Sequence, residues 1–79
     1  MKVLVIAGYD WQAGAWRNDQ PREIAEAARY VTGAEHILGC DPEATRYVLV
    51  GTWYEREHAR RALDACRLRG IPELERSRA

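Results

Sequence analysis

Two pairs of histidine and cysteine residues could support nucleophilic catalysis, because an imidazole can withdraw the proton of a thiol and leave a reactive thiolate. His36 and Cys40 lie four residues apart, and His58 precedes Cys66. On an extended strand, four residues separate two side chains by roughly 13 Å, which is too far for a hydrogen bond. Cys66 falls in the apolar stripe of an expected helix, where thiols are usually inert packing. We therefore predict no thiolate nucleophile and expect two free thiols in a reducing compartment.

Other patterns that would indicate catalysis or a cofactor are missing from the sequence. The two cysteines lack Cys-x-x-Cys spacing and any zinc-ligand pattern. Gly8 and Gly14 are not followed by the Gly-Lys-Ser/Thr that completes a phosphate-binding loop. No pair of carboxylates can be assigned to glycoside hydrolysis. We therefore expect a protein that is not an enzyme and that holds no metal and no cofactor.

Five arginines crowd the segment that should form the last helix. A ridge of guanidinium groups can bind phosphate, but three acidic residues are interleaved with them and leave a net charge of only +2. The whole chain is also balanced, with 12 basic and 12 acidic residues. A solvated, salt-bridged helix face is the favoured interpretation, and direct binding of nucleic acid is not expected. The arginines are Arg56, Arg60, Arg61, Arg67 and Arg69, and the acids are Glu55, Glu57 and Asp64.

The strongest signal for binding is a segment near the N-terminus that combines two tryptophans, a tyrosine and an arginine. These residue types are enriched in the hot spots of protein interfaces. The alternative is that both indoles fold back and cap a small core. Two further aromatic residues follow the expected third strand. The predicted partner-binding residues are Tyr9, Trp11, Trp16, Arg17, Trp53 and Tyr54.

Apolar runs and turn residues divide the chain into short alternating elements. The first run is β-branched and aliphatic throughout, which is typical of a central strand buried on both faces. The tryptophan segment has no periodicity and is expected to be a loop. In chain order we expect a strand at 2–9, a loop at 10–20, a helix from near 21 to 33, strands at 34–40 and 46–53, a helix at 54–69, a possible edge strand at 71–74 and a frayed polar tail at 75–79.

This order predicts a single α+β domain of residues 1–79, built as a two-layer β-α-β-β-α sandwich. Right-handed crossovers would place the first and third strands side by side and parallel, in a ferredoxin-like split βαβ arrangement. Two helices cover only one face of such a sheet, although both central strands are apolar on both faces. A homodimer or a docked partner would cover the open face, unless the tryptophan segment folds over it.

The second half of the chain also resembles a known family. Residues 47–53 read Tyr-Val-Leu-Val-Gly-Thr-Trp, and an alanine-lined helix that ends in Gly-Ile follows. This pattern resembles the second half of a SPOR domain over residues 46–71. The resemblance implies a module that binds peptidoglycan, with an open sheet face that holds glycan strands lacking stem peptides. On that basis Tyr47, Leu49 and Trp53 would contact sugar.

A small domain without net charge or a catalytic set is expected to act by binding another protein. In type, though not through a shared motif, the chain is similar to small phage inhibitors such as anti-CRISPR proteins. That resemblance implies a protein partner, a subunit of a bacterial defence complex. The apolar run at 3–8 is too short for a signal peptide or a membrane span, so we expect a cytoplasmic location and no membrane partner. SPOR-like binding of glycan strands is the alternative function.

Overall fold

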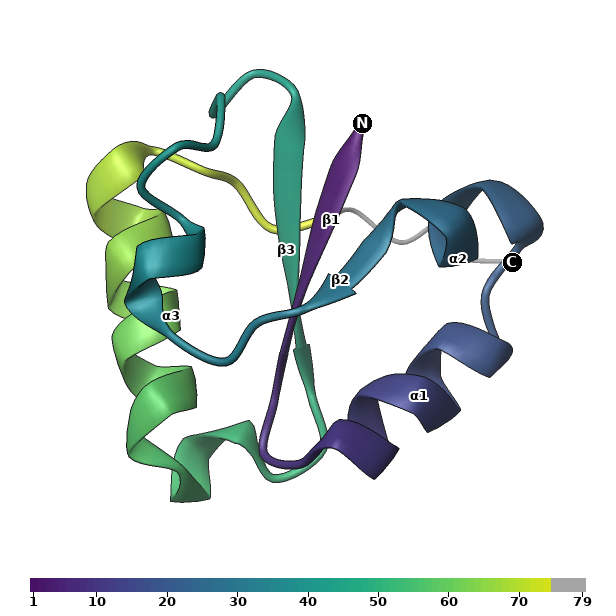
Figure 1. Cartoon of the computed structure of the whole chain (residues 1–79). Coiled ribbons are helices and arrows are strands. Elements are labelled where there is room, and N and C mark those ends of the chain that lie inside the picture. The colour runs from purple at the N-terminus through teal and green to yellow at the C-terminus, as the bar shows by residue number, and fades with distance from the viewer. Residues whose placement is uncertain (75–79) are drawn as a thin grey trace.

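The computed structural model describes residues 1–74, which form a three-stranded sheet covered by helices (Figure 1). In chain order the elements are β1 (Lys2–Ala7), α1 (Asp10–Asn18), α2 (Arg22–Ala27), β2 (Ala28–Tyr30), β3 (Thr45–Val50) and α3 (Glu57–Arg69). Short 3₁₀ turns lie at Ala34–His36 and Trp53–Glu55. The small, compact α+β fold expected from the sequence is confirmed at this level.

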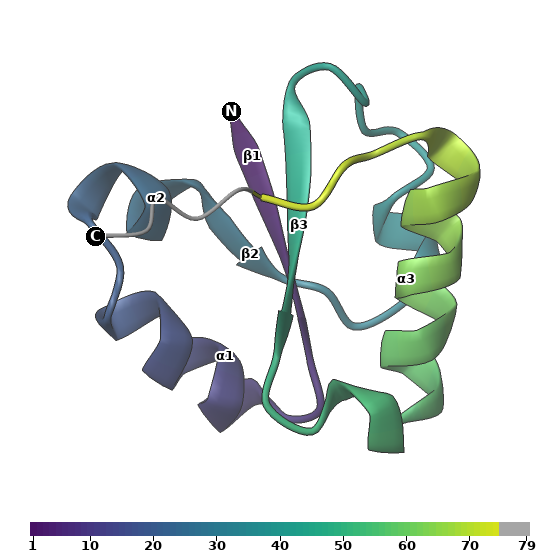
Figure 2. The ribbon, with the colours of Figure 1, turned by 180° about the vertical axis from the view of Figure 1, so that it is seen from behind.

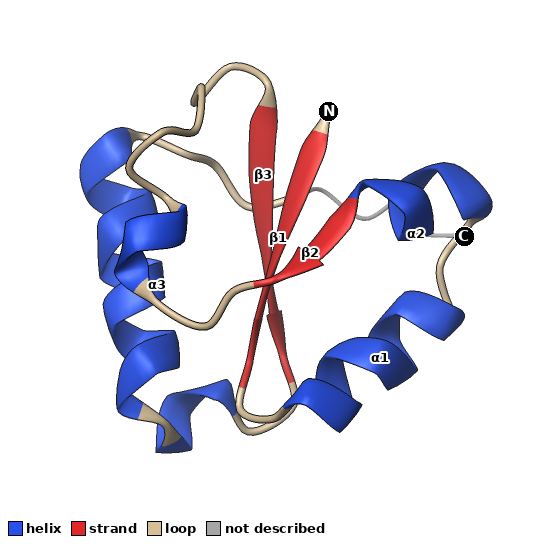
Figure 3. Cartoon of the chain, in the orientation of Figure 1, coloured by secondary structure: helices blue, strands red, loops and turns tan. Residues whose placement is uncertain are grey.

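The three strands are all parallel and lie in the order β2-β1-β3 (Figure 3). The central strand β1 pairs with β3 along its whole length, from Lys2 opposite Thr45 to Ala7 opposite Val50. Residues Val3 to Ala7 are buried on both faces of the sheet, which explains their uninterrupted apolar run. The predicted central first strand and its parallel pairing with the third strand are therefore confirmed.

Helices cover both faces of this sheet. α1 and α2 lie on one side and α3 lies on the other, with the strands between them in Figures 1 and 2. Alternate residues of β1 supply two separate cores: Leu4 and Ile6 pack with α3, whereas Val3 and Val5 pack beneath α1. The two-layer, ferredoxin-like arrangement is thus not confirmed. The open face that motivated a homodimer is absent from residues 1–74, and the homodimer stays a prediction.

The segment at 10–20, which was expected to be a loop, forms helix α1 and covers the second face. Its buried residues are Gln12, Ala13 and Trp16, and their spacing of one, three and four residues is that of one helix face. Gly14 weakens the helical signal, because glycine costs about 1 kcal/mol relative to alanine inside a helix. The alternative that this segment folds over the sheet is therefore the arrangement observed.

Two predictions in the middle of the chain are wrong. The helix expected to reach residue 33 begins after Pro21 as predicted but ends at Ala27, and the chain then pairs with β1 as strand β2. This pairing outweighs local helix propensity because it satisfies backbone groups along the edge of β1. The strand expected at 34–40 is instead a 3₁₀ turn and a loop. Ile37 and Cys40, three apart, are buried while Leu38 is exposed, which is not the alternation of a strand.

Helix α3 has the inner stripe that its sequence predicts. Its buried residues are Ala59, Ala62, Leu63 and Cys66. The helix begins at Glu57 rather than at residue 54, because Trp53–Glu55 forms a 3₁₀ turn. Gly70 ends it with φ +75°, and the N–H of Ile71 donates to the carbonyl of Cys66 at 2.9 Å. This closure is typical of a glycine that follows a helix.

The expected fourth strand is present only as one parallel bridge between Tyr47 and Glu73. The backbone N–H of Tyr47 donates to the carbonyl of Pro72 at 3.2 Å, and the carbonyl oxygen of Tyr47 accepts from the N–H of Leu74 at 2.8 Å. This segment covers the outer edge of β3. The frayed tail predicted at 75–79 lies outside the described residues. Among residues 1–74, no helix has both the length and the apolar character that a membrane span requires.

Candidate functional site

The carboxyl ends of β1 and β3 are where this fold favours a binding site. From β1 the chain passes over one face of the sheet through α1, whereas from β3 it passes over the other face through α3 (Figure 1). The two loops diverge from neighbouring parallel strands, which defines a topological switch point. Ligands of open parallel sheets bind in the crevice outside the strands at such a point. We call this end of the molecule, formed by residues 8–11 and 51–56, the carboxyl edge.

Gln12 fills the crevice between the two loops. Its side chain is largely buried, with the residue 8% exposed, and its Oε1 accepts from the N–H groups of Gly8 at 3.1 Å and Tyr9 at 3.2 Å. The same oxygen accepts from the N–H of Thr52 at 3.2 Å, while Gln12 Nε2 donates to Thr52 Oγ1 at 3.0 Å. Three backbone donors and the Thr52 hydroxyl, at 3.3 Å, meet this atom, which identifies it as the amide oxygen. These hydrogen bonds, the Gln12 bridge, tie the loop after β1 to the loop after β3.

Two glycines make room for the Gln12 bridge. A Cβ atom at Gly51 would lie 2.5 Å from Cδ of Gln12, and Gly51 has φ +59°. A Cβ atom at Gly8 would lie 2.9 Å from Gln12 Oε1 and 2.8 Å from the carbonyl oxygen of Thr52. Glycine is needed at both positions because the amide approaches the backbone so closely. The crevice is therefore filled by the chain itself.

Exposed aromatic residues belong to both of the segments that form the carboxyl edge. Tyr9, Trp11 and Tyr54 are 41%, 70% and 56% exposed, and all three belong to the carboxyl edge. Large exposed aromatic groups that belong to one edge of a small domain are candidates for contact with another molecule. The other exposed large hydrophobic residues of the described chain are Met1, Leu38 and Leu68.

Arg56 connects the aromatic groups of the two loops. Its guanidinium lies over the ring of Tyr9, 4.7 Å from the ring centroid, in a cation–π contact. The rings of Trp53 and Tyr54 meet at 86° with their centroids 5.9 Å apart, which is a favourable edge-to-face geometry. We call the set Tyr9, Trp11, Trp53, Tyr54 and Arg56 the aromatic rim. The structure thus brings four of the six predicted partner-binding residues to one edge.

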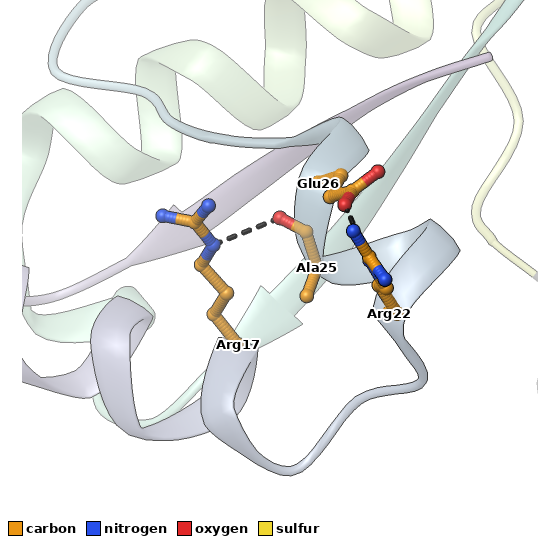
Figure 4. A network of polar contacts seen from close by, with 4 residues as sticks. All are labelled: Arg17, Arg22, Ala25 and Glu26. Atoms are coloured by element: carbon orange, nitrogen blue, oxygen red, sulfur yellow. Dashed lines mark hydrogen bonds and ion pairs between the residues drawn. The ribbon is translucent and has the colours of Figure 1, made fainter.

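The remaining two predicted residues lie elsewhere. Trp16 is 9% exposed and packs in the core beneath α1, where its Nε1 is buried with no hydrogen-bond partner among residues 1–74. Arg17 Nε donates to the carbonyl of Ala25 at 2.8 Å and joins α1 to α2, beside the Arg22–Glu26 ion pair (Figure 4). Of the two tryptophans in α1, Trp16 therefore caps the core and Trp11 faces solvent.

A polar pair lies beside the aromatic rim. Tyr30 Oη and His58 Nε2 are 3.5 Å apart, and the two rings are nearly perpendicular. Burial raises the pKa of the Tyr30 phenol, and the negative charge of Asp10 raises it further, although the positive charge of Arg56 opposes both effects. The phenol therefore stays protonated at neutral pH and can donate a hydrogen bond.

The thiols are buried in the core next to α3. Cys40 Sγ donates to the backbone carbonyl of His36 at 3.3 Å, and the imidazole of His36 instead contacts Thr32 Oγ1 at 3.3 Å. Burial raises the pKa of Cys66 to about 11, and the nearby Cys40 adds to the shift. Neither thiol has the imidazole contact that would activate it as a nucleophile. Residues 1–74 contain no cluster of three or more histidine, cysteine or acidic side chains that could hold a metal ion.

We expect the buried thiol of Cys66 to make the protein less stable in alkaline solution. Its pKa is about 11 in the folded protein, compared with an ordinary value of 9.0. The unfolded chain loses this proton first, so the contribution to stability is complete below pH 9 and is lost between about pH 9 and pH 11. The loss is on the order of 2 kcal/mol. Urea unfolding from pH 8 to pH 11 should show a steeper decline for the wild type than for Cys66→Ala, and parallel curves would contradict this assignment.

Sequence patterns do not point to Gln12, and they place Arg56 only in an arginine cluster whose favoured interpretation is a salt-bridged helix face. The one available signal is that Gly8 and Gly51 each directly follow a buried strand. Comparisons with protein-family models, with characterised proteins and with solved structures find no match. Function is therefore inferred from the carboxyl edge itself.

Proposed function

We propose that this protein is a small non-catalytic inhibitor that binds another protein through the aromatic rim. One observation carries the proposal: the exposed tyrosine and tryptophan side chains among residues 1–74 are Tyr9, Trp11 and Tyr54, and they all lie at the carboxyl edge. Such side chains anchor protein interfaces because they bury a large area at a low cost in conformational entropy. Arg56, which lies over Tyr9, adds the third residue type that dominates interface hot spots.

The filled crevice favours binding over catalysis. An active site needs a concave pocket in which several polar groups are free to converge on a substrate. At this switch point the backbone donors of both loops already serve Gln12. The aromatic side chains exposed at this edge are Tyr9, Trp11 and Tyr54, and such a surface beside a filled crevice suits a macromolecule better than a small substrate.

The proposed partner is a subunit of a bacterial surveillance complex, as the resemblance in type to anti-CRISPR proteins implies. The formal net charge of the chain is zero, so the chain has no overall field that would attract nucleic acid. A protein partner recognised through aromatic anchors is consistent with this balance.

Binding of glycan strands, which the resemblance to SPOR domains implies, is the second candidate. Trp53 supports it, because this residue lies in the aromatic rim. The other two implied sugar contacts do not: Tyr47 is buried, and Leu49 packs against the core beneath α3. Both faces of the sheet carry helices, so the geometry gives more support to a protein partner bound at the edge.

A plaque assay tests the proposal. Expression of the wild-type chain should restore plaques of a phage that a strain with active CRISPR interference otherwise restricts. The double variant Trp11→Ala, Tyr54→Ala should lose this effect and keep its melting temperature, because both side chains are mostly in solvent. Leu68→Ala is the matched control, since it removes a side chain of an 89% exposed residue of α3, outside the rim.

The outcomes separate the candidates. Equal activity of the double variant and the wild type would contradict the aromatic rim as the binding surface. If the wild type inhibited no surveillance complex in a panel of strains and instead sedimented with purified peptidoglycan sacculi, glycan binding would replace the proposed function.

A further inference from the structure

The backbone groups that hold Gln12 form an oxygen-binding cradle built from two separate loops. Gly8 and Tyr9 supply N–H donors after β1, and Thr52 supplies one after β3, all at 3.1–3.2 Å from a single oxygen. Convergent backbone donors of this kind bind negatively charged oxygen atoms when water is excluded. Neither loop has all three donors, so the cradle depends on the register that sets Ala7 opposite Val50.

We propose that this cradle is a carboxylate-binding site that the protein keeps closed with its own Gln12 side chain. A carboxylate would accept the same three N–H groups with a full negative charge, which strengthens each hydrogen bond. The Thr52 hydroxyl, which accepts from Gln12 Nε2 at 3.0 Å and donates to Gln12 Oε1 at 3.3 Å, can likewise donate to a carboxylate oxygen. The inference concerns the crevice beneath the aromatic rim and does not depend on the proposed function of the rim.

Truncation of Gln12 to alanine would empty the space that its amide group now fills. Gln12→Ala removes Cγ, Cδ, Oε1 and Nε2, and acetate has the same skeleton of a methyl carbon, a carboxyl carbon and two polar atoms. Gly8 and Gly51, which line this space, have no side chains that could refill it. Alanine is also the best helix former, so the first turn of α1 keeps its helical preference, although the N–H groups of Gly8, Tyr9 and Thr52 lose the acceptor that Gln12 supplies. Acetate is therefore the probe.

Acetate should raise the melting temperature of Gln12→Ala, by about 6–11 °C at ten times its Kd. Sodium chloride at the same ionic strength should not do so, and the wild type should show no specific rise because its own amide fills the cradle. The amide NMR signals of Gly8, Tyr9 and Thr52 in the variant should shift with the same Kd. An identical response to acetate and chloride, or an equal response of the wild type, would overturn the proposal.

Gln12→Glu provides a second test that leaves no cavity. The introduced carboxyl group should enter the cradle as an anion, so its pKa should fall below the ordinary glutamate value of about 4.3. Because that folded-state pKa is lowered, its contribution to stability is present above about pH 4.3 and is lost as the pH falls through the lowered value. An NMR titration that gave a pKa at or above about 4.3 would overturn the proposal, whether or not the alanine variant folds.

Discussion

Trp16→Ala is expected to remove a large part of the stability of this domain. The indole is almost completely buried and packs with Val3, Val5 and Val48 on the face that α1 and α2 cover. Truncation of a buried tryptophan to alanine costs about 3–5 kcal/mol, and a whole domain is typically stable by only about 5–15 kcal/mol. Urea unfolding followed by far-UV circular dichroism should therefore show a much lower midpoint, or no folded baseline.

Two variants serve as controls for Trp16→Ala. Trp11→Ala removes the same type of side chain from a 70% exposed residue of the same helix, and it should change the free energy of unfolding by less than about 0.5 kcal/mol. Trp16→Phe should cost much less than Trp16→Ala, because it keeps an aromatic ring and removes an indole N–H that has no partner among residues 1–74. Equal losses for Trp16→Ala and Trp11→Ala would contradict the division of the two indoles between core and rim.

The elements that the sequence predicts correctly are those whose own residues show which side chains are buried. β1 and β3 contain uninterrupted apolar runs at 3–7 and 47–50, and such runs indicate burial on both faces regardless of which element supplies the cover. α3 carries four buried residues at helical spacing and ends at a glycine with positive φ. In each case the residues of the element itself are enough to predict its type and its buried face.

The elements that fail depend on contacts with distant parts of the chain. β2 has only three residues, too few to show a period, and it is extended because it pairs with the edge of β1. α1 has a glycine in its middle and covers a sheet face that the sequence left open. The side of the sheet on which a short helix lies is set by the direction of the crossover, and composition does not report it.

The candidate site likewise has one part that the sequence predicts and one part that it does not. The four aromatic members of the rim could be predicted, because the residue types of interface hot spots are visible without coordinates. The Gln12 bridge could not, because it joins Gln12 to Thr52, 40 positions later in the chain. A glutamine in a helix usually lies on a solvated face, and only the parallel pairing of β1 with β3 brings the three donors around its oxygen.

Gly51→Ala is expected to destabilise the protein strongly, although it adds only one methyl group. The new Cβ atom would lie 2.5 Å from Cδ of Gln12, and a residue with a side chain is strained at φ +59° by about 1–2 kcal/mol. The amide must move to relieve the overlap, and the N–H groups of Gly8 and Tyr9 then lose their acceptor. A buried donor left without a partner costs about 1–3 kcal/mol; the Gly8 hydrogen bond is buried and that of Tyr9 is partly buried. We therefore expect a total loss of about 3 kcal/mol or more in urea unfolding.

Two other glycines separate backbone strain from the steric overlap. Gly70 also has a positive φ, +75°, but a Cβ atom there meets nothing within 4 Å, so Gly70→Ala should cost only the strain of about 1–2 kcal/mol. Gly14 in α1 has neither problem, and Gly14→Ala should stabilise the protein by about 0.5–1 kcal/mol. If Gly51→Ala cost no more than Gly70→Ala, the amide could leave the crevice without penalty, and the Gln12 bridge would not be what holds the two loops together.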